Sequence, residues 1–209
     1  MTPQTVDLPP LSFRAAVGSV NVDARTVDLI FSTGAPAERM DYWSGKRFIE
    51  KLSMDPGHVR LTRLNAGAPL LDAHSAWSVG DILGAVQPDS ARIENKRGLA
   101  TVRFSKRADV EPVFQDVKDG IIRNVSIGYR VYKFVEDAGK DGALAVRTAI
   151  DWEPFEISMV PMPVDVGARV RAGDKSDTNT CVIVVNEVST RDADRDRTFR
   201  RAALAGARC

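Results

Sequence analysis

A serine inside an apolar, strand-like run is the first side chain here that could act as a nucleophile. Ser126 lies in the run 121–135, and Gly128 follows two residues later. A serine attacks a carbonyl only when a base, an orienting group and oxyanion donors surround it. Gly128 has no side chain to obstruct a substrate backbone, but a purely structural serine fits the same spacing. Asn124 replaces the first glycine of the Gly-x-Ser-x-Gly elbow, which excludes the α/β-hydrolase class.

The chain has two histidines, and their surroundings differ. His74 follows the apolar pair Leu70–Leu71, and an imidazole exchanges protons near neutral pH, as a general base must. The alternative interpretation is a histidine at a strand end that satisfies a neighbouring polar group. His58 follows Asp55-Pro56 at the start of a predicted helix, so we expect a structural role for it.

A carboxylate, Glu156, lies in the apolar stretch FEISMVP. In one interpretation it is a charge on an edge strand that points to solvent. In the other it is partly buried, holds the imidazole of His74 in the correct tautomer and stabilises its charged form. The residues alone leave both interpretations open.

Three stretches together resemble the prohead proteases of tailed bacteriophages, the HK97-type serine peptidase family. They are LLDAHSAWSVGDILGAV, DVKDGIIRNVSIGYRV and WEPFEISMVPMPVDVGARV. In that family a histidine follows an apolar pair, a Ser-Ile-Gly-Tyr-type strand follows a helix and a glycine, and a Glu-Ile-Ser strand comes next. The order and spacing agree over about residues 10–171.

The resemblance implies a role for each motif residue. Ser126 matches the nucleophile, His74 matches the general base, and Glu156 is placed as the third member. Herpesvirus relatives use a second histidine late in the chain, whereas the only other histidine here precedes His74. We expect Ser126 Oγ and a ring nitrogen of His74 to lie within about 3–4 Å, or to reach that distance by a rotamer change. Ile127, Gly128 and Arg130 are the candidates for binding the oxyanion or substrate.

The resemblance also implies a function and a fold. It predicts a serine endopeptidase that cleaves the scaffold segment and major capsid protein inside the assembling prohead, in the bacterial host cytoplasm, and then cleaves itself. The chemistry requires no metal or organic cofactor. The implied fold is similar to the herpesvirus assemblins, a β-barrel flanked by helices, and dimers of those proteins make a homodimer an expectation.

Composition excludes several other classes. The charge balance of 29 Lys and Arg against 28 Asp and Glu argues against a nucleic-acid-binding protein, which needs a positive excess. No apolar run approaches the roughly 18–20 residues of a membrane span, and MTPQTVDLPP does not resemble a signal peptide. The two cysteines are too few for a disulfide framework or a multi-cysteine zinc site.

Hydrophobic patterning independently predicts a mainly β fold with a few helices, in which the strands form a closed or partly open barrel. A helix is expected after Asp55 as far as Gly67, and another is expected after a capping Asp109, ending at Gly120. Loops are expected at residues 32–46. The predicted strands are 13–20, 22–31, 48–51, 82–86, 91–94, 99–105, 121–135, 143–151, 156–160 and 181–188.

The same patterning predicts three regions in the chain. Residues 1–12 form an N-terminal extension, residues 13–171 the protease domain, and residues 172–209 a linker with a charged C-terminal extension. Two other functions fit a near-neutral β-rich domain: a non-catalytic capsid or scaffold component, and a barrel that binds a small ligand. The presence of Ser126 and His74, each in its motif, favours the enzyme.

Overall fold

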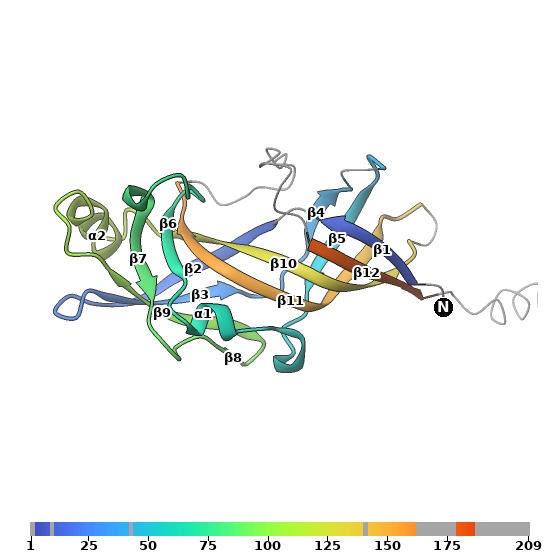
Figure 1. The fold of residues 1–209 in the computed structure, drawn as a ribbon, viewed down its shortest axis with the longest axis horizontal. Coiled ribbons are helices and arrows are strands. Elements are labelled where there is room, and N and C mark those ends of the chain that lie inside the picture. The colour runs from blue at the N-terminus through green and yellow to red at the C-terminus, as the bar shows by residue number, and fades with distance from the viewer. Residues whose placement is uncertain (1–2, 9–10, 42–43, 140–141, 162–178, 187–209) are drawn as a thin grey trace, which may run out of the picture.

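Strand-forming sequence dominates the chain, and the computed structural model is mainly β (Figure 1). It describes residues 3–8, 11–41, 44–139, 142–161 and 179–186. The strands are β1 (Pro3–Leu8), β2 (Leu11–Asn21), β3 (Thr26–Ser32), β4 (Ala37–Met40), β5 (Arg47–Leu52), β6 (Pro69–Asp72), β7 (Ile82–Val86), β8 (Arg92–Glu94), β9 (Arg97–Phe104), β10 (Asn124–Asp137), β11 (Ala145–Met159) and β12 (Asn179–Asn186). The helical segments are the 3₁₀ turns η1 (Pro56–His58) and η2 (Val79–Asp81) and the α-helices α1 (Thr62–Asn65) and α2 (Glu111–Lys118). In the described ranges, no helix has the length and hydropathy needed to cross a membrane.

The strands belong to one sheet that curls round on itself. Its pairing order is β1-β12-β10-β2-β3-β9-β7-β6-β11-β5-β4, and β8 pairs with β9. Because β10 also pairs antiparallel with β11, the path from β10 through β2, β3, β9, β7 and β6 to β11 returns to its start. The prediction of a mainly β fold with a curled, barrel-like sheet is thus confirmed. The likeness to herpesvirus assemblins remains a prediction.

The two longest strands, β10 and β11, extend along most of the sheet (Figure 1). At one end β10 lies between β2 and β11, and β11 lies between β10 and β6. Towards the other end, β12 joins β10 and β5 joins β11, each as a parallel neighbour. Residues 125–129 of β10 form an unbroken buried run. A strand paired on both sides and covered on both faces explains why this stretch lacks polar alternation.

The core contains a buried polar cluster that the sequence analysis did not predict. Glu50 is fully buried, and its Oε2 accepts hydrogen bonds from Arg39 Nε at 3.0 Å and from the Tyr129 hydroxyl at 2.6 Å. Burial, reinforced by the Glu50 carboxylate, raises the pKa of Tyr129 well above its ordinary value, so the phenol remains a neutral donor. Such partners are what a buried carboxylate requires.

The first predicted helix is divided in the structure. Asp55 caps only the short turn η1, and α1 forms separately before Gly67. Between them Val59 has extended backbone and forms a β-bridge with Trp152. Because Val59 pairs with the sheet, the helix predicted from local signals is interrupted at this residue.

The second predicted helix exists as α2, but its cap differs. Phe114 and Val117 are buried, as the apolar spacing predicts. The N-cap residue is Val110, which makes no side-chain capping bond, so the prediction that Asp109 caps this helix is wrong. The Asp109 carboxylate instead pairs with Arg107 at 3.0 Å.

Two predicted strands, 143–151 and 156–160, are one continuous strand, β11. Pro154, which cannot donate to a strand ladder, lies between them. In the structure, Gly128 of β10 pairs with Glu156 while the next residue along β10 pairs with Pro154, which leaves Phe155 as the extra residue of a β-bulge. Proline is tolerated at such bulges. The predicted loop at 32–46 likewise contains a short strand, β4.

Strands from both predicted extensions join the sheet. β12, from the segment 172–209, pairs parallel with β10, and β1, from the segment 1–12, pairs antiparallel with β12. Cys181 of β12 is buried. The boundaries of the protease domain at 13 and 171 stay a prediction, and the charged run 191–201 lies outside the described residues.

Candidate active site

Sheet register brings the three predicted catalytic residues to one place. Ser126 of β10 pairs directly with Ser158 of β11, and Leu71 of β6 pairs with Ser158 from the other side. His74 follows the end of β6 by two residues. Glu156 precedes Ser158 by two residues and therefore shares its face of the strand. Side chains that are far apart in the sequence thus meet at the junction of β6, β11 and β10.

Glu156 orients the imidazole of His74. The distance from His74 Nδ1 to Glu156 Oε1 is 2.6 Å. Because a carboxylate oxygen accepts, Nδ1 carries the hydrogen and Nε2 is left as the basic nitrogen. Glu156 is only 4% exposed, and β11 is not an edge strand here, since it lies between β10 and β6. The interpretation of Glu156 as a solvent-facing edge charge is therefore wrong.

Ser126 Oγ and His74 Nε2 are the two reactive atoms expected of a nucleophile and its base. Both are buried, and in the described part of the chain neither has a hydrogen-bond partner. A buried polar atom left without a partner costs about 1–3 kcal/mol, so each such atom calls for an explanation. That these two atoms lie within about 3–4 Å, or reach that distance by a rotamer change, stays a prediction.

His74 projects from a strained turn. In the turn 72–75, Ala73 has φ of 45° and His74 has φ of 64°, a left-handed conformation that favours glycine or asparagine. Hydrogen bonds to β11 hold it: Ala73 N–H donates to Met159 O at 2.9 Å, and His74 N–H donates to Ser158 Oγ at 3.1 Å. Strain of about 1–3 kcal/mol per residue persists where surrounding contacts fix the backbone, and it concentrates at functional sites.

Gly128 provides the space in which the carboxylate lies. A Cβ atom at this position would stand 2.5 Å from Glu156 Oε1 and 2.8 Å from Phe155 Cζ. Ile127 is fully buried. Both Ile127 and Gly128 lie where β10 pairs with β2 on one side and β11 on the other, so their N–H groups lie within the paired sheet.

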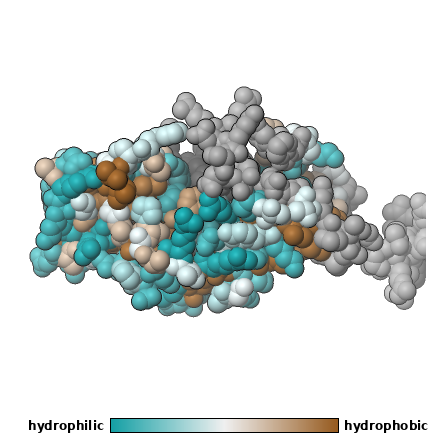
Figure 2. All heavy atoms as spheres, viewed as in Figure 1, coloured by the Kyte–Doolittle hydropathy of each residue, from teal (hydrophilic) through white to brown (hydrophobic). Residues whose placement is uncertain are grey.

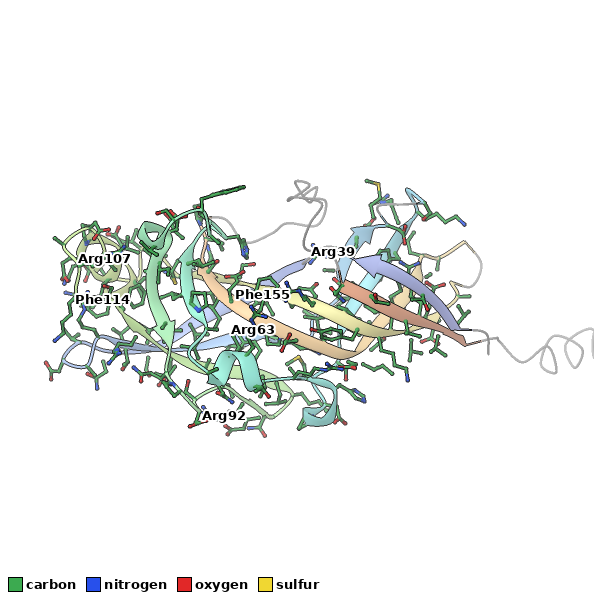
Figure 3. All side chains as sticks on the ribbon, viewed as in Figure 1. Arg39, Arg63, Arg92, Arg107, Phe114 and Phe155 are labelled. Atoms are coloured by element: carbon green, nitrogen blue, oxygen red, sulfur yellow. The ribbon has the colours of Figure 1, made fainter. Side chains whose placement is uncertain are left out.

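Two arginines flank the bulge residue beside Glu156. Arg130 Cζ lies 5.1 Å from the centroid of the Phe155 ring. Arg63 of α1 also lies beside Phe155 (Figure 3), with its Cζ 6.0 Å from the ring centroid. Of the three candidates for substrate or oxyanion binding, Arg130 alone brings a cationic side chain to this neighbourhood.

The loop after His74 is rigidly built and displays apolar side chains. Asp81 Oδ2 accepts hydrogen bonds from Ser75 Oγ at 2.7 Å and from Trp77 N–H at 2.8 Å, and Arg107 Nη1 donates to Val79 O at 3.0 Å. Trp77 is 87% exposed and Val79 81%. On the face shown in Figure 2, apolar residues gather at the end of the molecule that carries α2 and β7.

Sequence reasoning missed Ser158, although the signal was present. A residue two positions after Glu156 on a strand shares its face, and here it contacts both Glu156 and the backbone of His74. His58 behaves as expected, since its Nδ1 hydrogen-bonds Ser53 Oγ at 2.7 Å. Across the described ranges, no group of three or more His, Cys, Asp or Glu side chains is arranged to hold a metal ion.

Comparison with known proteins identifies a family for this chain. A family model described as caudovirus prohead serine protease matches residues 61–181, more than half of the chain. The chain is also 35% identical over 143 residues to a protein named major capsid protein from Halomonas phage phiHAP-1, in a match that covers 68% of this chain but only 23% of that protein. No solved structure matches. On the strength of the family match, the chain belongs to the caudovirus prohead serine protease family.

Proposed function

We propose that this chain is a serine endopeptidase that cleaves scaffold and capsid protein during prohead maturation, and that it also cleaves itself. The observation that carries the proposal is the hydrogen bond of 2.6 Å between Glu156 and His74 Nδ1. It leaves Nε2 as a base that lacks a hydrogen-bond partner among the described residues, as does the hydroxyl of Ser126. Membership of the prohead protease family supports the choice of a peptide bond as the substrate.

In the proposed reaction, His74 Nε2 takes the proton from Ser126 Oγ as that oxygen bonds to the carbonyl carbon of the scissile peptide. The Glu156 carboxylate stabilises the imidazolium that forms. His74 then gives its proton to the leaving amine, and the acyl-enzyme forms. Water then loses a proton to His74 and bonds to the acyl carbon, the bond from that carbon to Ser126 Oγ breaks, and His74 returns the proton to Oγ. Because Ser126 is only 1% exposed, the atoms that cover Oγ must move aside when a substrate binds.

The developing oxyanion needs a donor outside the paired backbone of β10. The N–H groups of Ile127 and Gly128 lie where β10 is paired on both sides, which leaves Arg130 as the preferred candidate of the three. Its guanidinium packs against Phe155, next in sequence to Glu156. A guanidinium is suited to a carbonyl oxygen that gains negative charge, directly or through a water molecule.

A non-catalytic role in the capsid is the second candidate function. The relative from Halomonas phage phiHAP-1 is named a major capsid protein, and the chain spans about a quarter of its length. In this alternative the curled sheet serves assembly and the Ser126–His74–Glu156 arrangement performs no chemistry. Either function places the protein in the assembling capsid within the host cytoplasm. A homodimer remains part of the proposal.

Co-expression with the major capsid protein of the same particle separates the two functions. The wild-type chain and the Ser126→Ala variant are compared by gel electrophoresis and mass spectrometry, which also maps the cleaved junction. Ser32→Ala is a matched control, since Ser32 is an equally buried serine on β3. Proteolysis by the wild type and the control, but not by Ser126→Ala, supports the protease. Unprocessed capsid protein with the wild-type chain favours the non-catalytic role.

A further inference from the structure

A second serine, Ser158, links the carboxylate to the backbone of the catalytic histidine. It is fully buried, and its Oγ donates a hydrogen bond to Glu156 Oε2 at 2.6 Å. The same oxygen accepts the His74 N–H at 3.1 Å. The two oxygens of Glu156 are thus divided between His74 Nδ1 and Ser158 Oγ. One hydroxyl contacts both members of the pair that must activate Ser126.

We propose that Ser158 is a positioning residue for the Ser126–His74–Glu156 site, an inference that rests on the proposed function. It acts through two bonds. The bond to Glu156 Oε2 fixes the rotation of the carboxylate, so that Oε1 faces Nδ1. The bond from the His74 N–H holds the backbone of that residue in its left-handed conformation, with φ of 64°.

The two hydrogen bonds fix the orientation of the imidazole ring. Without the acceptor at Ser158, the turn 72–75 loses the bond that holds the His74 backbone to β11 and retains the Ala73–Met159 bond, and the strain at His74 favours relaxation. Ring displacement of about 1 Å is enough to cost about 100-fold in rate, because proton transfer requires aligned atoms. The hydroxyl of Ser158 itself is engaged by both contacts, whereas that of Ser126 has no partner among the described residues. This contrast assigns attack to Ser126 and positioning to Ser158.

The first test is a kinetic cycle on the peptide that spans the junction mapped by co-expression. Ser158→Ala is expected to lower kcat by about 10–100-fold with KM within about twofold, because the substrate contacts remain. Ser158→Thr keeps the hydroxyl and should restore most of the rate. The double variant with Glu156→Gln should be little slower than Glu156→Gln alone, since both changes act on His74. Ser32→Ala serves as the buried-serine control.

The second test does not depend on activity. The chain has two histidines, so nitrogen NMR of the imidazoles reports on His74 with His58 as an internal reference. In the wild type, His74 should carry its hydrogen on Nδ1, and Ser158→Ala should shift the His74 signals while those of His58 stay in place. Melting temperature shows that each variant is folded.

These outcomes separate the inference from the proposed function. The positioning role is overturned if Ser158→Ala has wild-type kinetics. It is also overturned if the rate loss of the double variant equals the product of the losses of Ser158→Ala and Glu156→Gln. If the wild-type chain cleaves nothing, the protease proposal fails, and the NMR measurement then tests whether Ser158 positions His74. His74 signals that do not respond to Ser158→Ala then overturn the inference, and a selective shift supports the positioning of His74 by Ser158.

Discussion

Replacing Glu156 with glutamine removes the negative charge beside His74 while keeping the side chain's shape. The carboxylate is buried and lies 2.6 Å from Nδ1, whereas the imidazole side chain is 30% exposed. With charge centres about 4 Å apart and an effective dielectric of about 20, the attraction between carboxylate and imidazolium is about 4 kcal/mol. That corresponds to about 10³ in rate, and partial exposure of the ring reduces it.

A change in the tautomer of His74 would lower the rate further. If the glutamine turns its amide N–H towards His74, Nδ1 must accept that hydrogen bond. The imidazole hydrogen then lies on Nε2, which can no longer act as the base. In a chymotrypsin-type protease, the equivalent loss is about 10⁴. We therefore expect Glu156→Gln to lower single-turnover cleavage by about 10²–10⁴.

The assay is single-turnover cleavage of the mapped junction peptide across a range of pH. Glu153→Gln is the matched control, because Glu153 lies on the same strand and accepts a hydrogen bond from the Tyr132 hydroxyl at 2.9 Å. It should change the rate by less than about twofold. A Glu156→Gln variant as fast as this control would show that the carboxylate does not assist His74, and would reduce the site to Ser126 and His74.

Gly128→Ala should lower the cleavage rate by about 100-fold or more, measured on the same peptide, because the new methyl group must displace the Glu156 carboxylate from its position 2.5 Å away. A Gly128→Ala variant with full activity would exclude this steric role. Burial alone would raise the pKa of Asp41, but hydrogen bonds from Arg147 and a nearby backbone N–H lower it to about 2. Above pH 4, the free energy of unfolding of the wild-type chain should therefore exceed that of Asp41→Asn by about 1–2 kcal/mol. Denaturant titrations should show this difference decreasing as the pH falls towards 2, because Asp41 then becomes protonated. A difference that is constant over this pH range would contradict the lowered pKa of Asp41. Asp81→Ala should make the loop after β6 a preferred cleavage site in limited proteolysis with trace chymotrypsin, since three hydrogen bonds to Asp81 Oδ2 hold that loop; an unchanged digestion pattern would argue against this role.

Much of the fold was predictable because its signals are local. The strand at 82–86 has the predicted bounds, and β10 falls within three residues of them, since β-branched runs between turn residues identify strands directly. The errors arise where distant pairing overrides local signals. Val59 leaves its predicted helix to bridge to Trp152, and Pro154 interrupts the pattern of β11 without ending the strand.

The site was predictable only as a set of residue types. The motifs proposed Ser126, His74 and Glu156, and the spacing from Glu156 places Ser158 on the same face of the strand, but its bond to the backbone of His74, 84 residues away, has no local pattern. Burial of Glu156 depends on the neighbours of β11, which spacing along the chain does not reveal. Gly128 was expected to admit substrate, whereas the structure shows that the space is filled by the Glu156 carboxylate.

Reaction of the folded chain with diisopropyl fluorophosphate, followed by peptide mapping, tests directly whether Ser126 is an activated nucleophile. An activated serine oxygen displaces fluoride from phosphorus, and an ordinary serine does not react. We expect one adduct, on Ser126, that forms in Ser158→Thr and is lost in His74→Ala. An adduct on Ser158, or a folded wild-type chain that remains unlabelled at Ser126, would contradict the assignment of Ser126 as a nucleophile activated by His74.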